Sequence, residues 1–466
     1  MEERIRRLND VPVNPAGDYV LYWAQMNRRV PANHALLYAA RIANDIDRPV
    51  LYYEGLTNSY PCASDRMHTF LLEGVPDTAR GLEPLGIGYA FYLRRRTADA
   101  NDILYRLAER ASAVVTDDYP AFLAAAHNAR VPARIARAYH AVDSSCVVPM
   151  SLFPKREWAA YTLRPKIRKL LPQYLRAPDS PRVRRRWTAP PPPWHVAVTP
   201  DAVAKLVASC EIDHSVPPSL TFSGSRSHAQ RRLAEFLEKR LPRYAEYRNE
   251  PSAHATSNLS PYLHFGRLSS LEAALAARDD AHEHQRNAGE FLEELIVRRE
   301  LAFNYARHVA QPDTLDNLPD WARNTLRDHA ADARPVLYTR EQFERAATHD
   351  ALWNATQKEL LLRGTIHGYY RMYWGKKLIE WSPTCQDAFE TMVYLHDRYA
   401  LDGRDPNTYA NILWCFGLHD RPWPQRPVFG SVRYLSLEGM RRKTDVDAYI
   451  REIRGLENTG RDPFPA

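Results

Sequence analysis

The chain has 466 residues and a mass of 53.6 kDa, enough for two or three domains of ordinary size. Hydrophobic residues make up 45% and charged residues 26% of it, which are globular values and exclude a disordered or fibrous chain. Lysine and arginine number 63 against 56 aspartates and glutamates, and this net charge of +7 is compatible with a nucleic-acid partner.

Cysteine usage and hydropathy indicate the compartment. The five cysteines form an odd set without a CxxC pair, which argues against a disulfide scaffold and against a zinc ribbon. No apolar run approaches the roughly 20 residues of a membrane-spanning helix, and the N-terminus lacks the apolar core of a secretory signal. We therefore expect no membrane association and a cytoplasmic location.

The first 150 residues alternate short apolar runs with segments of helical periodicity. Runs rich in aromatic and β-branched residues are expected as buried strands at 19–23, 50–53, 88–92 and 113–115. Apolar residues recur at helical spacing in 33–46, 64–72 and 98–111. The alternation predicts an α/β domain over residues 1–176 with a doubly wound parallel sheet. Residues 24–28 carry no GxGxxG after the first strand, so a conventional dinucleotide site is not expected.

A proline-rich stretch separates this part from a helical one. Residues 177–218 include the run from Pro190 to Pro193 and are expected to form an extended, semi-rigid interdomain linker. Helix-period apolar residues then recur in 227–239, 270–277, 290–309, 340–348, 355–363, 369–381 and 384–399. Residues 219–466 are therefore predicted to form an all-α C-terminal domain.

Two features of this second part could carry chemistry. Trp374 and Trp381 are seven residues apart on one expected helix, hence on one face and roughly 10 Å apart along its axis. Core packing is the commoner role of an indole, and a redox role needs a cofactor beside it. Residues 256–262 combine hydroxyls with backbone donors before a helix and can hold a phosphate, although an ordinary helix cap is the commoner explanation.

The chain offers weak candidates for a metal site. His282, Glu283 and His284 lie beside Asp279 and Asp280, but residues two apart do not share a helix face. The carboxylates of residues 402–407 have the wrong spacing for a calcium loop. We expect no metal ligands.

Together the segments resemble a known family. The chain is similar to class II cyclobutane pyrimidine dimer photolyases of the photolyase/cryptochrome family, most densely in residues 256–266, 291–301, 370–381 and 401–434. Several long motifs in one order make the resemblance specific. It implies an N-terminal α/β domain that can host an antenna chromophore of the deazaflavin or folate type. It also implies a helical domain that encloses FAD.

The resemblance assigns a set of residues to the flavin. Arg371 and Asp402 resemble a buried salt bridge near the isoalloxazine ring, and such a pair can stabilise a reduced, anionic flavin. Trp374, Trp353 and Trp381 match the class II tryptophan relay, in that order outward from the flavin. The other implied FAD contacts are Tyr244, Thr256, Ser257, Asn258, Leu259, Ser260, Phe291, Asp405 and Asn407.

The implied reaction is light-driven DNA repair, in which an electron from excited, reduced FAD splits the dimer and then returns. The dimer must leave the base stack to reach the flavin. Glu294 matches the carboxyl that hydrogen-bonds the flipped bases, and Met372 matches a residue beneath the dimer. The residues implied to hold DNA, by stacking, by filling the emptied position or by binding phosphate, are Arg248, Arg298, Trp414, Arg421, Trp423, Arg433 and Arg441. The implied partner is damaged double-stranded DNA, bound by a monomer that is nucleoid-associated if the source is bacterial.

Two positions depart from the family pattern. Arg298 stands where some members carry a tryptophan on the wall of the dimer pocket, so a guanidinium contact would replace stacking there. His396 stands where the class II pattern has asparagine, beside the reactive flavin nitrogen. Because an unperturbed histidine has a pKa near 6.5, we expect the one-electron-reduced flavin to change its protonation or lifetime between about pH 5.5 and 8.5. The alternative is that His396 points away from the flavin.

A cryptochrome-like blue-light receptor is the alternative function. Glu294, Met372, Trp414 and Arg433 favour repair over signalling, because all four match residues that would contact DNA or the dimer. A non-enzymatic nucleic-acid binder would leave the conjunction of the salt bridge and the three relay indoles unexplained. The resemblance therefore implies an enzyme of the deoxyribodipyrimidine photolyase type, a carbon–carbon lyase.

Overall fold

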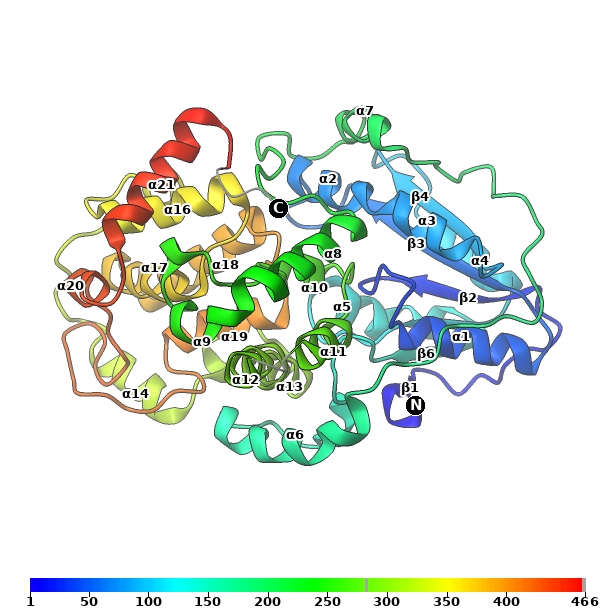
Figure 1. Cartoon of the computed structure of the whole chain (residues 1–466), viewed down its shortest axis with the longest axis horizontal. Coiled ribbons are helices and arrows are strands. Elements are labelled where there is room, and N and C mark those ends of the chain that lie inside the picture. Colours follow the sequence, from blue (N-terminus) through cyan, green and yellow to red (C-terminus); the bar gives the residue numbers. More distant parts are fainter. Residues whose placement is uncertain (281–283, 463–466) are drawn as a thin grey trace.

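The computed structural model describes residues 1–280 and 284–462. His282 and Glu283, considered above as metal ligands, lie outside these ranges. Figure 1 shows an α/β part formed by the first third of the chain and a helical part formed by the second half, joined by a long connector. Among the described residues no helix is long and apolar enough to cross a membrane.

The α/β part is built on a six-stranded sheet with the strand order β1-β6-β5-β2-β3-β4. The strands are β1 (Ile5–Arg7), β2 (Tyr19–Ala24), β3 (Val50–Thr57), β4 (Gly88–Arg94), β5 (Ala111–Asp117) and β6 (Ala138–Val142). β1 pairs antiparallel with β6, and the other neighbours pair parallel. The four expected strands are present. β1 and β6 were not expected. They have three and five residues, which is too short for a recognisable strand pattern in the sequence.

Helices cover both faces of this sheet. α1 (His34–Asp45) packs on one face and α4 (Ile103–Arg110) on the other. The other helices of this part are α2 (Asp65–Glu73), α3 (Val75–Leu82), α5 (Phe122–Arg130) and α6 (Ala160–Tyr174), of which α6 packs against the helical part; the short turns are η1 (Glu2–Arg4), η2 (Pro132–Arg134) and η3 (Met150–Leu152). Along β2 the side chains alternate: Val20 packs in the cluster with α1, and Leu21 packs in the cluster with α4. The predicted doubly wound sheet is therefore confirmed.

The turn after β2 explains why this domain lacks a phosphate loop. The backbone N–H groups of Gln25, Met26 and Asn27 all donate to the Asp117 carboxylate at the end of β5, at 2.7–2.9 Å. In nucleotide-binding relatives of such a fold, free N–H groups at this point hold a phosphate. Here a side chain of the protein itself occupies them.

The connector follows the edge of the sheet instead of crossing open solvent. Its Val196 N–H donates to the carbonyl of Phe91 in β4, and Trp187 packs edge-on against Tyr19 with ring centroids 5.6 Å apart. Gly88 makes room for the indole, since a Cβ there would lie 2.4 Å from the Trp187 ring. The connector holds η4 (Pro200–Ala202) and α7 (Val203–Ala208). The boundaries at 177 and 218 stay a prediction.

The second part is helical, as the periodicity predicted. Its elements are α8 (Arg226–Glu235), η5 (Phe236–Arg240), η6 (Leu241–Arg243), α9 (Tyr244–Tyr247), η7 (Pro251–Ala253), α10 (Ser260–His264), α11 (Ser270–Asp279), α12 (Gln285–Leu292), η8 (Glu293–Arg298), α13 (Arg299–Arg307), η9 (Leu315–Asn317), α14 (Asp320–Asp328), α15 (Arg340–Glu344), α16 (Ala351–Arg363), α17 (Gly368–Trp381), α18 (Cys385–Tyr399), α19 (Pro406–Cys415), α20 (Leu437–Arg441) and α21 (Val446–Thr459). The segments 227–239 and 290–309 are not continuous α-helices as expected, because η5 and η8 are π-helical insertions. Such insertions often mark functional sites.

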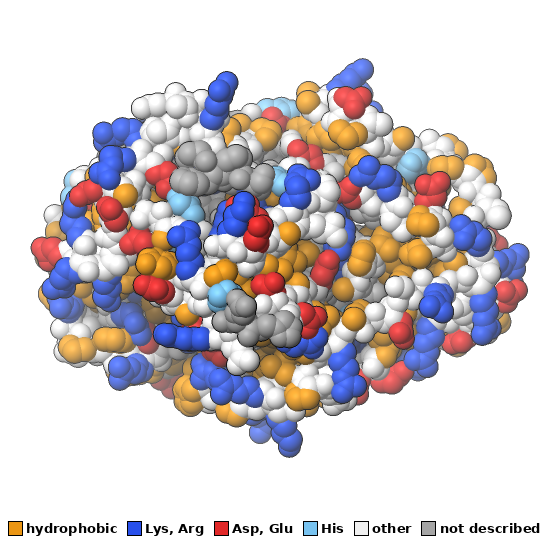
Figure 2. All heavy atoms as spheres, in the orientation of Figure 1, with side chains coloured by type: hydrophobic (Ala, Val, Ile, Leu, Met, Phe, Trp, Pro, Cys, Tyr) orange, Lys and Arg blue, Asp and Glu red, His pale blue; other side chains and the backbone are white. Residues whose placement is uncertain are grey.

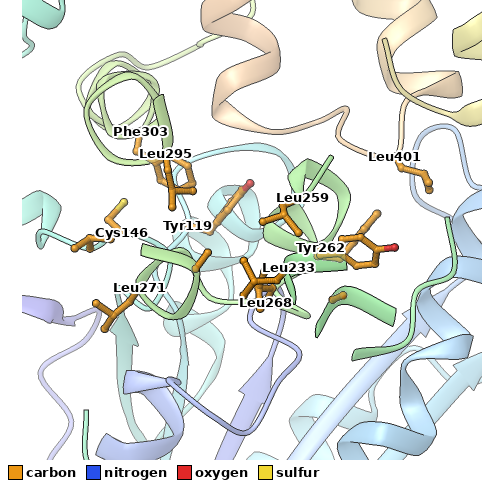
Figure 3. Close-up of a cluster of buried hydrophobic side chains, with 14 of the residues drawn as sticks. Tyr119, Cys146, Leu233, Leu259, Tyr262, Leu268, Leu271, Leu295, Phe303 and Leu401 are labelled. Atoms are coloured by element: carbon orange, nitrogen blue, oxygen red, sulfur yellow. The ribbon is translucent and has the colours of Figure 1, made fainter. Parts of the chain in front are cut away.

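The two parts share one hydrophobic core. Tyr119 and Cys146 from the α/β side meet Leu259, Leu295 and Phe303 from the helical side in a single buried cluster (Figure 3). The Tyr119 ring packs edge-on against Phe303 with centroids 5.3 Å apart. This shared core fixes the helical part, and with it the site described next, relative to the sheet.

Candidate functional site

A cavity of about 840 Å³ lies within the helical part. All residues expected to contact FAD line it, and so do Glu294, Met372, Trp374, His396, Arg248, Arg298, Trp414 and Arg433. Trp353, Trp381, Arg421, Trp423 and Arg441 are not among its lining residues. The structure therefore brings most of the expected residues to one cavity, although they are spread over 190 residues of sequence.

The loop before α10 forms one wall. The Thr256 hydroxyl donates to the Asn258 side-chain oxygen at 3.1 Å, and Asn258 adopts a left-handed backbone conformation with φ +53°. Tyr244 lies nearby, its ring edge-on to Phe291 with centroids 5.7 Å apart, and burial raises the pKa of its phenol to about 12. The wall thus combines hydroxyls and a tight turn with neutral aromatic surface.

Arg371 and Asp402 form the expected ion pair. Arg371 Nη2 lies 3.0 Å from Asp402 Oδ2 and 3.2 Å from Oδ1, and it also donates to the Ile366 carbonyl. Burial opposes ionisation of Asp402, but Arg371 and a hydrogen bond from Ser260 outweigh it and lower the pKa of this carboxyl. Arg371 Nε is buried without a partner among the described residues. A buried N–H left free beside the cavity fits a ligand that supplies an acceptor, as FAD would.

His396 lines the same cavity, so the alternative that it points away is not what the structure shows. Its Nδ1 lies 3.0 Å from the Met392 carbonyl, which can only accept, so Nδ1 carries the proton and Nε2 is an acceptor when the ring is neutral. Burial, helped by Arg371, lowers the pKa of His396 to about 4. With this pKa the ring itself stays neutral between pH 5.5 and 8.5, which argues against the expected change in the flavin over that range.

Three buried indoles lead away from the cavity. Trp374 lines the cavity, and Trp353 stacks on it with centroids 6.1 Å apart and planes at 5°. Trp381 lies 6.3 Å beyond Trp353, edge-on. Trp374 Nε1 donates to Gln357 Oε1 at 2.9 Å, and Trp353 Nε1 donates to the Trp374 carbonyl at 3.0 Å. The spatial order from the cavity is Trp374, Trp353, Trp381.

Glu294 lies on the π-helical turn η8 and faces α9. Its Oε1 accepts from Arg248 Nη1 at 2.7 Å, while Arg298 lies nearer to Glu293, with Nε 3.7 Å from Oε1. The Arg248 guanidinium also lies over the Tyr244 ring at 6.0 Å. An acidic side chain that is partly exposed at the cavity is thereby held in place by a neighbouring cation.

Arg433 lies between two indoles at the rim of the cavity. Its guanidinium lies 4.1 Å from the Trp423 ring centroid and 5.4 Å from that of Trp414, and Asp420 accepts from its Nε at 2.9 Å. The Arg421 guanidinium also lies over the Trp423 ring, 5.1 Å from its centroid. Trp423 and Arg421 thus belong to the rim although they do not line the cavity.

Two expected residues have other contacts in the structure. Arg441 lies on α20 and pairs with Asp447 at 2.9 Å. Asp405 lines the cavity, but it caps α19 and its carboxylate also accepts from Tyr119 at 2.5 Å and faces His264 Nδ1 at 3.1 Å. These bonds give Asp405 a positioning role toward α19.

Sequence reasoning missed some of the residues that complete the site. Asn411 lines the cavity together with Asn407 and Trp414, and the spacing i, i+4, i+7 on one helix is the signal that could have found it. Lys376 lies beneath Trp414 with Nζ 5.2 Å from the ring, and burial lowers its pKa to about 8. Nothing in the local sequence distinguishes Lys376 from a surface lysine.

A smaller cavity of about 120 Å³ lies at the carboxyl ends of β2 and β3. Trp23, Gly55, Phe122 and His127 are among its lining residues, together with Phe265 from the helical part. Open parallel sheets bind ligands at this edge. Across residues 1–280 and 284–462 the structure holds no cluster of three or more His, Cys, Asp or Glu side chains that could bind a metal ion.

Comparison with known proteins connects this geometry to a family. The family model described as DNA photolyase matches residues 20–185. A deoxyribodipyrimidine photo-lyase of Methanothermobacter thermautotrophicus is 38% identical over 97% of this chain and 98% of its own length. This chain belongs to the photolyase/cryptochrome family. A deoxyribodipyrimidine photo-lyase of Oryza sativa is also 38% identical, over 97% of this chain and 90% of its own. The expected family and an enzyme of the photolyase type are thereby confirmed.

Solved structures agree on the fold. A class III photolyase from Agrobacterium tumefaciens matches 95% of this chain and 87% of its own with a TM-score of 0.67 at 21% identity. A cryptochrome from Synechocystis sp. PCC6803 matches 95% of this chain and 89% of its own, also with a TM-score of 0.67, at 16% identity. The predicted combination of a parallel-sheet α/β domain and a helical domain is confirmed.

Proposed function

We propose that this protein is a class II photolyase that binds FAD in the 840 Å³ cavity and repairs cyclobutane pyrimidine dimers in DNA under light. The observation that carries the proposal is the convergence of three groups on that cavity: the Arg371–Asp402 pair, the stacked indoles that begin at Trp374, and Glu294 at the mouth. Bound FAD would supply the light-driven electron that splits the dimer.

The chain's own residues would hold the cofactor and set its charge. Thr256, Ser257 and Ser260 offer hydroxyls to phosphate and ribitol oxygens. Arg371 is paired with Asp402, and its Nε is still free to donate a hydrogen bond to a ligand in the cavity. A cation at this place favours a reduced, negatively charged flavin ring. His396 offers an acceptor at Nε2 in its neutral form.

The mouth of the cavity would receive the flipped dimer. Glu294 can accept hydrogen bonds from the imide groups of the bases, and Arg248 keeps its carboxylate oriented toward the cavity before DNA arrives. Met372 offers a polarisable surface against the dimer. Arg298 replaces an aromatic wall with a guanidinium that can stack on a base or bind a phosphate.

The rim would hold damaged double-stranded DNA around the flipped bases. Arg433, sandwiched between Trp414 and Trp423, presents a flat, cationic surface of the size of a base. Arg421 adds a second cation at the same place. We assign Arg441, which is exposed on α20, to a peripheral phosphate contact.

The 120 Å³ cavity is the site we propose for an antenna chromophore of the deazaflavin or folate type. Trp23 and Phe122 supply apolar ring surface there, and the site lies on the sheet edge that faces the helical part. A chromophore in this place would lie within the same rigid molecule as the flavin, because both parts share one core.

One sample tests the proposal. We expect the purified protein to show flavin absorption bands, to release FAD on heating, and to restore dimer-containing DNA under near-UV or blue light. Protein without flavin, or flavin-loaded protein that repairs equally well in darkness, would contradict the proposal. An additional absorption band that disappears in Trp23→Ala while the flavin bands persist would support the antenna site.

A cryptochrome-like light receptor is the second candidate. The observation in its favour is that the fold matches a cryptochrome as well as it matches a photolyase. Sequence similarity separates the two, since a cryptochrome of Arabidopsis thaliana aligns over only 25% of this chain. A receptor would bind FAD and respond to light without restoring dimers.

A further inference from the structure

The most exposed large apolar side chains among the described residues lie together at the start of α6. Tyr161 is 69% exposed and Trp158, three residues before it, is 64% exposed. Single exposed apolar residues are ordinary, but these two exposed aromatic rings lie three residues apart in the chain and offer apolar surface to a partner. α6 lies at the edge of the molecule beneath α12 and α13 (Figure 1).

The surroundings of these rings are strongly basic. Residues 155–176 contain seven lysines and arginines and one acidic residue, Glu157. Glu157 is buried and pairs with Lys166, so its charge does not face the solvent. Figure 2 shows blue and orange side chains gathered along this edge of the molecule. Lys155, Arg168 and Lys169 are exposed, and Arg156 lies 5.8 Å from the Trp158 ring.

This surface is continuous with the rim of the cavity. Arg164 of α6 pairs with Glu293 at 2.7 Å, and Glu293 in turn faces Arg298, which lines the cavity. A second connection runs through Arg156, whose guanidinium lies 5.2 Å from the Tyr305 ring. The same ring contacts His419, the neighbour of the rim residue Asp420, with centroids 6.0 Å apart. A strand that leaves the cavity mouth therefore meets Arg298 and then Arg164 before it reaches the exposed rings, whereas Tyr305 is buried and links the two regions only inside the protein.

Exposed rings beside cations suit one kind of nucleic acid in particular. Bases in a duplex are already stacked on one another, whereas unpaired bases can stack on Trp and Tyr while lysine and arginine bind the phosphates. We infer that Trp158, Tyr161, Lys155, Arg168 and Lys169, here called the α6 surface, bind single-stranded DNA that extends from the cavity. This inference rests on the proposed function, because it takes the strand in the cavity to be DNA.

The test compares two dimer-containing single strands. One has about 16 nucleotides, the length of a large single-strand site, and the other has about four, the length of the smallest site. Binding is measured by fluorescence anisotropy at several salt concentrations. The wild type should bind the long strand at least tenfold more tightly than the short one. Trp158→Ala/Tyr161→Ala should remove most of that gain and leave short-strand binding, duplex binding and light-driven repair of the short strand unchanged.

Two matched double variants test whether the strand is bound by the positive charges of the α6 surface or by positive charge anywhere on the molecule. Lys155→Ala/Lys169→Ala should lower the slope of log K against log salt on the long strand by about 1.4, at about 0.7 for each single-strand phosphate. Arg184→Ala/Arg185→Ala removes two exposed arginines from the connector and should change neither slope nor affinity.

Equal long-strand affinity of the wild type and Trp158→Ala/Tyr161→Ala would overturn the inference. Equal losses on duplex and single strand would overturn it as well, since they would show a general DNA contact. If no strand is repaired in light, the proposed function fails, while the dependence of binding on strand length still decides the role of the α6 surface.

Discussion

Trp374 is the residue at which the cavity meets the stacked indoles. It contacts the cavity on one side, lies parallel to Trp353 on the other, and is fixed by the hydrogen bond to Gln357. A phenylalanine at this place keeps the apolar packing but is far harder to oxidise. A phenylalanine at this position would therefore test the proposed electron supply to the flavin without removing the packing of the core.

We expect Trp374→Phe to slow light-driven reduction of bound, oxidised FAD by at least about tenfold, because the electron must then cross from Trp353 directly. Chemically pre-reduced Trp374→Phe should repair dimers at the wild-type rate. Flavin absorption under steady blue light with an external donor gives the measurement. Photoreduction at the wild-type rate would show that Trp374 is core packing alone.

His396 makes a prediction about pH. Its pKa is about 6.5 in the unfolded chain and about 4 in the folded one, so the unfolded chain binds the additional proton between these values. The stability contributed by the neutral ring is present above pH 6.5 and lost as the pH falls toward 4. The free energy of unfolding of the wild type, relative to His396→Asn, should fall by about 3 kcal/mol between pH 7 and pH 4.

Urea titrations of both proteins at several pH values measure this difference. A constant difference would mean that the His396 side chain reaches water in the folded protein. The ring of His396 should not titrate between pH 5.5 and 8.5. The rate of FAD photoreduction should therefore depend on pH in the same way in the wild type and in His396→Asn over this range.

The identities of these residues could be predicted from sequence, but their electrostatics could not. The resemblance singled out His396 and the Arg371–Asp402 pair. The lowered pKa of His396 follows from the burial of its ring, which packs edge-on against Trp374 of α17. No local pattern shows how deeply the ring is buried, so the sequence analysis could use only the unperturbed pKa of histidine.

At the scale of elements, the turn η8 changes which side chains meet. An uninterrupted helix would place Glu294 and Arg298 on one face, four residues apart. The π-helical turn changes the hydrogen-bonding register, and Glu294 pairs with Arg248 of the segment after α9 instead. Apolar spacing predicts that a helix is present and not how its backbone hydrogen bonds are registered, so the insertion could not be predicted.

The segment after α19 carries the rim, and Arg433 tests it. Arg433→Ala should weaken binding to a dimer-containing duplex by at least about tenfold and weaken binding to a dimer-containing single strand less. A guanidinium that fills the position left by the flipped bases has no such position to fill in a single strand. Anisotropy titrations on both substrates give the ratio. Equal losses would reduce Arg433 to a phosphate contact, with a salt slope lowered by about one.

At the scale of the whole molecule, Arg66 ties the two parts together. This buried residue of α2 donates to the carbonyls of Leu360 and Leu361 in the last turn of α16 and to that of Tyr399 at the end of α18. The Leu360 carbonyl also accepts from the N–H of Gly364, so Arg66 adds a second donor there, and a cation at the C-terminus of a helix complements the helix dipole.

Arg66→Met should destabilise the protein by about 3–5 kcal/mol, because buried carbonyls lose their donor. Arg106→Met is the matched control, since Arg106 forms an exposed pair on α4 and should cost less than about 1 kcal/mol. Urea unfolding followed by far-UV circular dichroism gives both values. Similar stability of the two variants would mean that the parts are held together without Arg66.

The large-scale architecture could be predicted because it follows from periodicity. The buried runs and helical spacings of residues 19–115 predict the sheet and its helices, and the helical spacings after residue 219 predict the second part. The packing of the connector along β4 and the core shared around Tyr119 could not be predicted. Both depend on contacts between residues that are far apart in the chain.

The central claim is that the cavity serves light-driven dimer repair, and one measurement tests it most directly. Purified protein with reduced FAD is mixed with an oligonucleotide that carries one thymine dimer, and the products are separated by chromatography after illumination or darkness. We predict restored thymines under blue light and none in darkness. Restoration in darkness, or none in light with reduced FAD and bound DNA both verified, would contradict the account.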